Sequence, residues 1–518
     1  MRLVTSINRG SVIFVMGCLL ALCASATAQA DLSREQQLND GVSEARAYAA
    51  SGQIGQAKTV VDSLFAEFAD VPEFVGQMRP VAGDLFFKGR DNAASLEMCQ
   101  RLLALSPDRT EQGLLHALMA RILVRSEQFD QAKTVVETLF VEFPDMPDFV
   151  GRLSNIIGEF RSKHEYKTAL DTCQRLLALS PDRHEQARLH TLQAQAHVRL
   201  GQIDLAKGVV DTLFAEFADT PDFVKGLRPL ANEFLRLNEH STALDMCERL
   251  LSLSPNRSEQ AHLYIIQTRA LVRLGQFDQA EANVESLFVN YSDAPNFVGR
   301  MVQFVVREFL LQHKHATALD MCQRLMALSS SQAELLYAHG GLARCYVRLG
   351  DDAKVLEIVN IILEEYGDIE GASRMLLLIG KEYYFMGEDA ARAQNTALVR
   401  HAFLHAAEIW ERFISKTPEL NWPEFPYFTA IALQQAGEHK RATDYFRVVI
   451  DRWPNYNRRQ NAMAMLAECY DVLKHKQEVP ISEANRAIRE IYTTMVNDYP
   501  DARGVELAIE WLVVHADK

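Results

Sequence analysis

The chain has 518 residues, of which 48% are hydrophobic and 24% charged, and its formal net charge is -14. This length exceeds one ordinary hydrophobic core, and 25 Gly with 16 Pro are too few for long disordered tracts. The acidic balance argues against a nucleic-acid partner, because phosphates would be repelled unless a strong basic stripe were present.

Residues 1–30 have the pattern of a secretory signal peptide. Arg2 and Arg9 precede the apolar run "SVIFVMGCLLALCA", and "SATAQA" then offers small residues at cleavage spacing. We predict cleavage after Ala28 or Ala30 and export to the periplasm or cell envelope. Loss of the two arginines changes the net charge from -14 to -16. No later segment reaches 18 uninterrupted apolar residues, so we predict no transmembrane span in the mature protein.

An alternative for the same segment is lipidation at Cys18, which would make the protein an outer-membrane lipoprotein. The letters "VMGC" resemble a bacterial lipobox. The apolar run before Cys18 is short and the one after it is long, so cleavage without lipidation is the favoured prediction.

One phrase is written four times along the chain. "TALDTCQRLLALSPDRHEQ", which begins at Thr168, has three near copies, and each copy holds one cysteine. A second phrase, first seen as "GQIGQAKTVVDSLFAEFADVPEFV", lies between the copies, so a unit of about 74 residues consists of two halves of about 37. A fixed period of this size indicates a solenoid, in which each unit buries its apolar face against a neighbour. The cysteines, spaced by 74, 74 and 75, are Cys99, Cys173, Cys247 and Cys322.

Each half-unit predicts two helices. In the quoted phrase, apolar or small residues recur at the spacing of an amphipathic helix, from Ala169 through Cys173 to Leu177, and Pro181 ends the pattern. A capping pair then starts the next helix. The four such pairs are Asp108/Glu111, Asp182/Glu185, Asn256/Glu259 and Ser331/Glu334. In the other half-unit, we predict Asp145 as the helix cap with Pro147 in the first turn.

The spacing of small residues, prolines and glycines resembles the tetratricopeptide repeat (TPR). A small residue is followed twelve positions later by a helix-ending proline at Ser95/Pro107, Ala132/Pro144, Ala169/Pro181, Ala243/Pro255, Ala406/Pro418 and Ala442/Pro454. Glycines fit the turn between the two TPR helices at Gly52, Gly201, Gly275, Gly350 and Gly437. The repeat here, near 37 residues, is longer than the usual TPR unit, and most aromatic and glycine positions of the first TPR helix are missing.

The resemblance implies an all-α fold, a right-handed αα-hairpin solenoid of about twelve hairpins. We predict a regular solenoid over 31–370 and an irregular one over 371–518. Extra residues between Gly387 and Thr417 are expected to lengthen a helix, and another insertion follows "YDVLKHKQEVPIS". The phrase "ATDYFRVVIDRWPNYNRRQNAMAMLAECY" is similar to TPR segments of bacterial envelope proteins, including outer-membrane assembly lipoproteins.

The repeated cysteines are interpreted as small buried hydrophobic residues. Cysteines two hairpins apart would lie on the order of 20 Å from each other, whereas a disulfide needs Cα atoms within roughly 7 Å. Cys322 and Cys345 are the one pair on neighbouring predicted helices, and they leave a disulfide open as an alternative.

Motifs for catalysis are absent from the sequence: it has no phosphate-binding glycine loop, no G-x-S-x-G and no H-E-x-x-H. We therefore predict a protein that is not an enzyme, with no catalytic residues and no cofactor. The best metal candidate is His401, His405 and Glu408, which share one helix face. A solvated helix face has the same composition, so we predict no metal site.

An arginine ladder recurs near the end of the first helix in alternate hairpins. Its members are Arg125, Arg199, Arg273 and Arg348, with Arg121, Arg269 and Arg344 four residues before three of them. Gln195 takes the earlier position in the remaining copy. Like charges at this spacing disfavour a helix, which indicates that the arginines have partners. In TPR proteins the first helices line the concave groove, so the resemblance implies that the ladder binds acidic side chains or a C-terminal carboxylate. The favoured interpretation is that the arginines pair internally with Asp and Glu, or simply copy an ancestral unit.

A second candidate surface is "NWPEFPYF", Asn421 to Phe428, whose aromatic side chains could form an exposed apolar patch. Packing at the join of the two solenoid parts is the favoured interpretation.

Three functions remain open. The favoured one is a non-enzymatic scaffold in the bacterial cell envelope that binds a protein or peptide in its groove. The second is a lipid-anchored subunit of an envelope assembly complex. The third, least favoured, is an enzyme with its site in 371–518.

Overall fold

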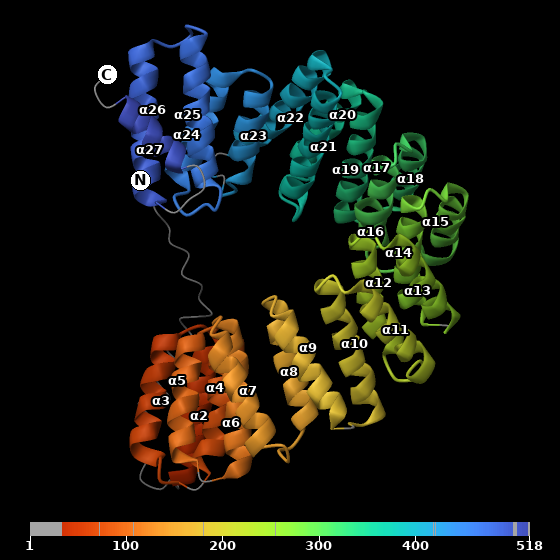
Figure 1. The fold of residues 1–518 in the computed structure, drawn as a ribbon. Helices are drawn as coiled ribbons and strands as arrows, with labels where there is room; N and C mark the ends of the chain where they lie inside the picture. The colour runs from red at the N-terminus through yellow and green to blue at the C-terminus, as the bar shows by residue number, and fades with distance from the viewer. Residues whose placement is uncertain are drawn as a thin grey trace. The chain divides into compact units, whose positions relative to one another are not determined.

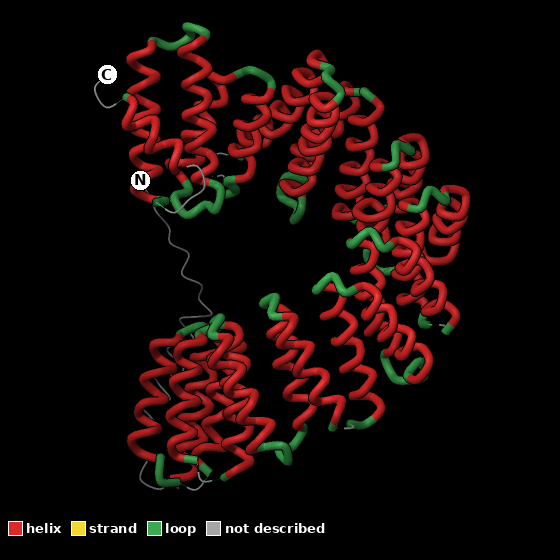
Figure 2. Tube along the Cα trace, viewed as in Figure 1, coloured by secondary structure: helices red, strands yellow, loops and turns green. Residues whose placement is uncertain are grey.

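The computed structural model describes residues 34–71, 73–106, 108–179, 181–253, 255–417, 419, 421–500 and 505–515. Throughout this part of the chain the regular structure is helical and no strand occurs (Figures 1 and 2). The prediction of an all-α hairpin solenoid is therefore confirmed. The predicted signal peptide and Cys18 lie outside the described residues. Within them, no helix combines the length and apolar character needed to cross a membrane.

The helices belong to two compact units, which divide between Glu233 and Phe234, inside α12 (Phe223–Arg236). Before the division lie α2 (Arg34–Ala50), α3 (Ile54–Phe68), α4 (Phe74–Phe87), α5 (Asn92–Leu105), α6 (Arg109–Arg125), α7 (Phe129–Glu142), α8 (Phe149–Ser162), α9 (Tyr166–Ala178), α10 (Arg183–Arg199) and α11 (Ile203–Glu216). After it lie α13 (His240–Ser252), α14 (Arg257–Arg273), α15 (Phe277–Tyr291), α16 (Phe297–Arg300), the π-helical turn η2 (Met301–Val306), α17 (Arg307–Leu311), α18 (His315–Leu328), α19 (Gln332–Leu349), α20 (Asp352–Glu365), α21 (Ala372–Arg392), α22 (Thr396–Lys416), α23 (Glu424–Gln435), α24 (His439–Arg452), α25 (Arg459–His475), α26 (Ile481–Asp498) and α27 (Val505–Val514).

Consecutive helices pair as hairpins, and first helices also pack on one another. In the first unit α2 contacts both its hairpin partner α3 and the next first helix, α4, and the pattern continues from α4 to α6 and from α6 to α8. In the second unit α19 contacts α20 and α21 in the same way. Within each unit these hairpins thus bury their apolar faces against one another, as a solenoid requires.

Each hairpin turns through one residue with a left-handed backbone. Five of these residues are the glycines predicted for the inter-helix turn, with φ between 72° and 83°. The other seven are Arg90, Glu127, His164, Asn238, His313, Gln394 and Gln477. The twelve turn residues mark twelve hairpins, followed by α27. Successive turns are 37 or 38 residues apart up to Gly350, and then 44, 43 and 40. The predicted boundary at residue 370 stays a prediction, since the two compact units divide elsewhere.

The predicted caps are mostly confirmed. Side chains of Asp182, Asn256 and Ser331 accept hydrogen bonds from the backbone N–H three residues later, at 2.9, 3.0 and 3.3 Å. Asp108 accepts from Thr110 instead. Each bond satisfies one of the backbone donors that a helix leaves free at its start.

The prediction of Asp145 as a cap with Pro147 in the first turn of the helix was wrong. α8 begins at Phe149, after Asp148 with φ of 55°. The intervening turn packs Met146 into the core, where it is 5% exposed, and the Pro147 carbonyl accepts a hydrogen bond from the Arg152 side chain. α12 and α16 also begin directly after a residue with a left-handed backbone, at Asp222 and Asn296, so this turn and not the proline sets where the helix starts.

A π-helical turn accounts for the one unequal spacing of the repeated cysteines. The spacing from Cys247 to Cys322 is 75 residues instead of 74. The segment from α16 to α17 accordingly has one residue more than α8 or α12, and η2 lies at its centre. A π-helical turn contains one residue more than an α-helical turn, so the residues after it keep the same side of the helix toward their neighbours.

The extra residues predicted between Gly387 and Thr417 do lengthen helices. α21 and α22 each have 21 residues, whereas α20 and α24 have 14. The insertion is therefore shared by both helices of one hairpin.

The cysteine interpretation is also confirmed. The six cysteines of the described residues are free and fully buried. Cys322 and Cys345, the pair for which a disulfide was left open, are two free thiols whose sulfur atoms are 3.9 Å apart.

Candidate binding surface

The arginine ladder lies on first helices and meets a row of glutamates on the next first helix. Arg121 and Arg125 of α6 contact Glu159 of α8, and Arg199 of α10 contacts Glu233 of α12. In the second unit, Arg269 and Arg273 of α14 contact Glu308 of α17, and Arg344 and Arg348 of α19 contact Glu382 of α21. Glu159, Glu233, Glu308 and Glu382 recur at intervals of 74, 75 and 74. Sequence reasoning missed this acidic row, although its period was visible.

In three copies one carboxylate lies between two guanidinium groups. Glu159 accepts from Arg121 at 2.8 Å and from Arg125 at 2.9 Å. Glu382 accepts from Arg344 at 3.0 Å and from Arg348 at 2.7 Å. Charge-assisted bonds of this length are the stronger hydrogen bonds in proteins, and here each set joins two hairpins.

Burial and charge act against each other on these carboxylates. Burial alone would raise the pKa of Glu382, but the charges of Arg344 and Arg348 and their hydrogen bonds lower it below its usual value. The same balance lowers the pKa of Glu159, beside Arg125 and Arg121. Both glutamates are therefore ionised at neutral pH.

The ladder is not equally accessible along the chain. The side chains of Arg125 and Arg199 are 37% and 40% exposed, whereas those of Arg344 and Arg348 are 9% and 12% exposed. The contacts give each arginine an intramolecular partner, as one of the two sequence interpretations expected. Peptide binding by the same arginines stays a prediction.

The ladder is interrupted in α10, where Gln195 replaces the earlier arginine. Arg161 of α8 donates a hydrogen bond to the Gln195 side chain. Arg161 stands where the corresponding helices carry Leu235 and Leu310. Burial lowers the pKa of Arg161. Among the described residues Arg161 has no carboxylate within ion-pair distance, so a half-buried cation replaces an apolar side chain at this point.

A cavity of about 480 Å³ adjoins this interruption. It lies among α8, α10 and the start of α12, all within the first unit. Arg188, which donates to Asn155 at 3.2 Å, adds a second guanidinium to the lining. Phe223 and Leu192 supply apolar walls. Asp222 also lines the cavity, so two guanidinium groups and one carboxylate face it. A cavity with this excess of positive charge and with apolar walls could accept an acidic group that has an apolar neighbour.

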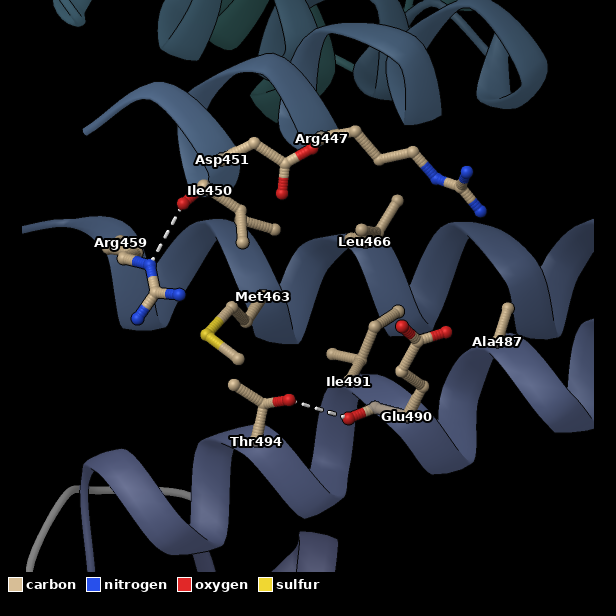
Figure 3. A pocket seen from close by; sticks show the side chains of 10 residues that line it. All are labelled: Arg447, Ile450, Asp451, Arg459, Met463, Leu466, Ala487, Glu490, Ile491 and Thr494. Atoms are coloured by element: carbon tan, nitrogen blue, oxygen red, sulfur yellow. Dashed lines mark hydrogen bonds between the residues drawn. The ribbon is translucent and has the colours of Figure 1, made fainter. Parts of the chain in front are cut away.

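A second cavity, of about 280 Å³, lies among α24, α25 and α26 (Figure 3). Its cations already have partners: Arg447 donates to the Tyr470 hydroxyl, and Arg459 pairs with Asp498 at 2.9 Å. Asp451 and Glu490 also line it, so the cavity has mixed charge. Its two guanidinium groups are balanced by two carboxylates, whereas the cavity beside Arg161 is lined by two guanidinium groups and one carboxylate.

The aromatic loop is largely packed. Phe425 and Tyr427 are 0% and 3% exposed, and Phe425 lies against Phe413 with ring centroids 4.1 Å apart. Trp422 is the exception, at 46% exposed. The rings of Phe425 and Tyr427 are packed and form no exposed apolar patch, but their partners lie on α22 and after α24, and not at the join predicted at residue 370.

In the structure, the third residue beside the candidate metal ligands His401 and His405 is Asp352 and not Glu408. His401 and His405 of α22 meet Asp352 of α20, with one ligand atom from each residue within 4.8 Å of the others. Glu408, the third residue of the sequence candidate, instead contacts Nδ1 of His405 at 3.4 Å. Sequence reasoning missed Asp352 because it belongs to another helix.

These features define an all-helical hairpin repeat protein whose first helices are joined by arginine–glutamate contacts. No protein-family model matches the chain. The chain is 28% identical over 253 residues to lipopolysaccharide assembly protein B of Escherichia coli strain K12. The aligned segment covers 47% of this chain and 60% of that protein. The same protein in Escherichia coli O6:H1 and O157:H7 gives the same values. The chain thus spans about three-fifths of the length of these relatives.

A chain in the solved structure of Naa15/Naa10 bound to HypK-THB aligns over 94% of this chain and 79% of its own length. The sequence identity is 10% and the TM-score 0.30. The curated relatives are named for assembly and not for a catalytic reaction.

Proposed function

We propose that this protein is a non-enzymatic, TPR-like scaffold of the bacterial cell envelope that binds a protein or peptide. The observation that carries the proposal is the cavity beside Arg161, where a half-buried guanidinium has no carboxylate partner among the described residues. The similarity to lipopolysaccharide assembly protein B supports a role in an assembly process. The signal-peptide pattern of residues 1–30 supports export, and the lipid-anchored alternative depends on Cys18.

Binding would be by equilibrium recognition of an acidic side chain or a C-terminal carboxylate. Arg161 would bind that group directly, and Arg188 would add a second cation from α10. Phe223 and Leu192 would contact the apolar part of the partner. Arginine suits this role because its planar guanidinium binds a carboxylate through two parallel hydrogen bonds.

The ladder arginines are a second candidate for the same partner. Arg125 and Arg199 favour it, because their side chains remain more than one-third exposed while paired with glutamate. A partner carboxylate at either position would compete with Glu159 or Glu233.

The test compares capture of partners from envelope extract by wild type and two variants. The first is the double substitution of Arg161→Leu with Gln195→Arg, which rebuilds the regular repeat. Leucine occupies the Arg161 position in two other copies, and the arginine introduced by Gln195→Arg would face Glu233 as Arg121 faces Glu159. This variant is expected to fold as well as wild type and to lose the partner. The second variant changes Arg125, Arg199, Arg273 and Arg348 to Gln and reports on the ladder.

Arg175→Gln is the matched control, since Arg175 is an arginine of a second helix, paired with Glu137. Equal capture by wild type and the double variant would reject the Arg161 site. Loss of capture only in the quadruple variant, with circular dichroism unchanged, would move the site to the ladder.

Location is tested separately by cell fractionation. We expect processed protein in the periplasmic fraction, and Cys18→Ser is expected to leave it there. Lipid labelling that disappears in Cys18→Ser would favour the lipid-anchored alternative.

A further inference from the structure

We infer that Asp352, His401 and His405 form a binding site for a divalent metal ion of the Zn²⁺ type, joining α20 to α22. This inference is independent of the proposed scaffold function. All three residues lie in the second unit and are partly exposed, with side-chain exposures of 26%, 41% and 22%. A metal ion could therefore enter from solvent.

The spacing of the ligand atoms fits a metal. Oδ2 of Asp352 is 3.2 Å from Nε2 of His401 and 3.6 Å from Nε2 of His405. In a tetrahedral zinc site with bonds of about 2.1 Å, neighbouring ligand atoms are about 3.4 Å apart. The two histidines are four residues apart on one helix, the arrangement that directs both rings to one side.

The surrounding groups orient the ligands. Tyr383 donates its hydroxyl to Oδ1 of Asp352, which leaves Oδ2 facing the histidines. Nδ1 of His405 faces Oε2 of Glu408 at 3.4 Å. A carboxylate at Nδ1 favours the tautomer in which Nδ1 carries the proton and the Nε2 lone pair points to the metal.

Glu408 is in turn held in place. Arg412 donates to Glu408 at 2.8 Å and to Asn360 of α20 at 3.0 Å. The ring of Tyr383 also stacks on the ring of His405, with centroids 5.2 Å apart. Two of the three candidate ligands, Asp352 and His405, thus have a second residue that fixes their orientation. Such orienting contacts are typical of metal sites, whereas a chance contact between histidine and aspartate does not require them.

The experiment is a titration of untagged, EDTA-treated full-length protein with Zn²⁺ against a competing dye, and with Co²⁺ followed by visible absorption. We expect one equivalent of bound metal and the intense absorption of tetrahedral Co²⁺. His401→Gln and His405→Gln are each expected to weaken Zn²⁺ binding by at least about tenfold, and Tyr383→Phe to weaken it by roughly tenfold. Zn²⁺ should also raise the thermal unfolding midpoint of wild type and not that of His405→Gln.

His475→Gln is the matched control, because His475 contacts Asp471 on α25 at 3.4 Å without a second histidine. Its Zn²⁺ affinity should equal that of wild type. Wild type that binds no stoichiometric Zn²⁺ or Co²⁺, or binding that is unchanged in His401→Gln and His405→Gln, would overturn the inference. Circular dichroism of the metal-free variants distinguishes ligand loss from misfolding.

Discussion

Glu382 and Arg344 form an ion pair of 2.9 Å in which the two side chains are only 6% and 9% exposed. Arg348 shares the same carboxylate from the other side. These buried charges join two first helices, α19 and α21. Removing one partner of a buried ion pair costs more free energy of unfolding than removing one partner of an exposed pair.

Glu382→Gln is predicted to destabilise the protein by about 3 kcal/mol, because it leaves the buried guanidinium group of Arg344 without its carboxylate and leaves Arg348 with only the longer contact to Asp389, at 3.5 Å. Urea unfolding followed by circular dichroism measures the change. Glu285→Gln, which breaks the exposed pair of Glu285 with Arg324, is the control and should cost less than about 1 kcal/mol. Equal losses in the two variants would show that the Glu382 cluster is no stronger than a surface pair.

The same cluster predicts a dependence on acid. The folded-state pKa of Glu382 is lowered from its usual 4.5, so the folded protein holds this proton less tightly than the unfolded chain. The stabilisation is therefore fully present above about pH 5 and is lost as the pH falls through the folded pKa.

We accordingly expect the stability difference between wild type and Glu382→Gln to be constant above about pH 5 and to shrink as the pH falls below that value. Urea unfolding at a series of pH values tests this. A difference that also stays constant below about pH 5 would contradict the assigned ionisation.

How much the sequence could predict follows from the range of each interaction. Hairpins, turn glycines and buried cysteines depend on local periodicity, and Gly275 or Cys173 could be placed from their neighbours in the chain. The partner of Arg348 could not, because Glu382 is 34 residues away and only the stacking of hairpins brings the two together. Asp352 was missed for the same reason. The start of α8 was misplaced because the left-handed backbone of Asp148, which the proline signal does not reveal, sets it.

The turn residues predict a pair of opposite stability changes. Gly275 has φ of 75° and open space where a Cβ would lie, so Gly275→Ala should cost about 1 kcal/mol through backbone strain alone. Gln477 has φ of 60°, and Gln477→Gly should stabilise by up to about 1 kcal/mol. Thermal unfolding of the two variants checks both signs. Destabilisation by Gln477→Gly would mean that its side chain contributes more than the strain costs.

The buried thiols should be chemically silent. Burial raises the pKa of Cys99, Cys173 and Cys469 to about 12, so the thiolate share near pH 8 is about one in ten thousand. We expect no alkylation of these residues by iodoacetamide in the native protein and complete alkylation in urea, as mapped by mass spectrometry. Rapid native labelling of Cys173 would show that its helix opens or that its burial is incomplete.

The π-helical turn at Met301–Val306 has a consequence for how such a chain can change in length. The π-helical turn accommodates one inserted residue, and Glu308 still pairs with Arg273. The contact between these two first helices is therefore kept although the chain is one residue longer. Whole units should be exchangeable on the same ground. A chain lacking residues 108–181 would join Pro107 to Asp182, and Glu185 would then occupy the place of Glu111, which binds Arg79. The repeated contacts thus predict that a chain with one unit fewer keeps the same kind of contact between its remaining units.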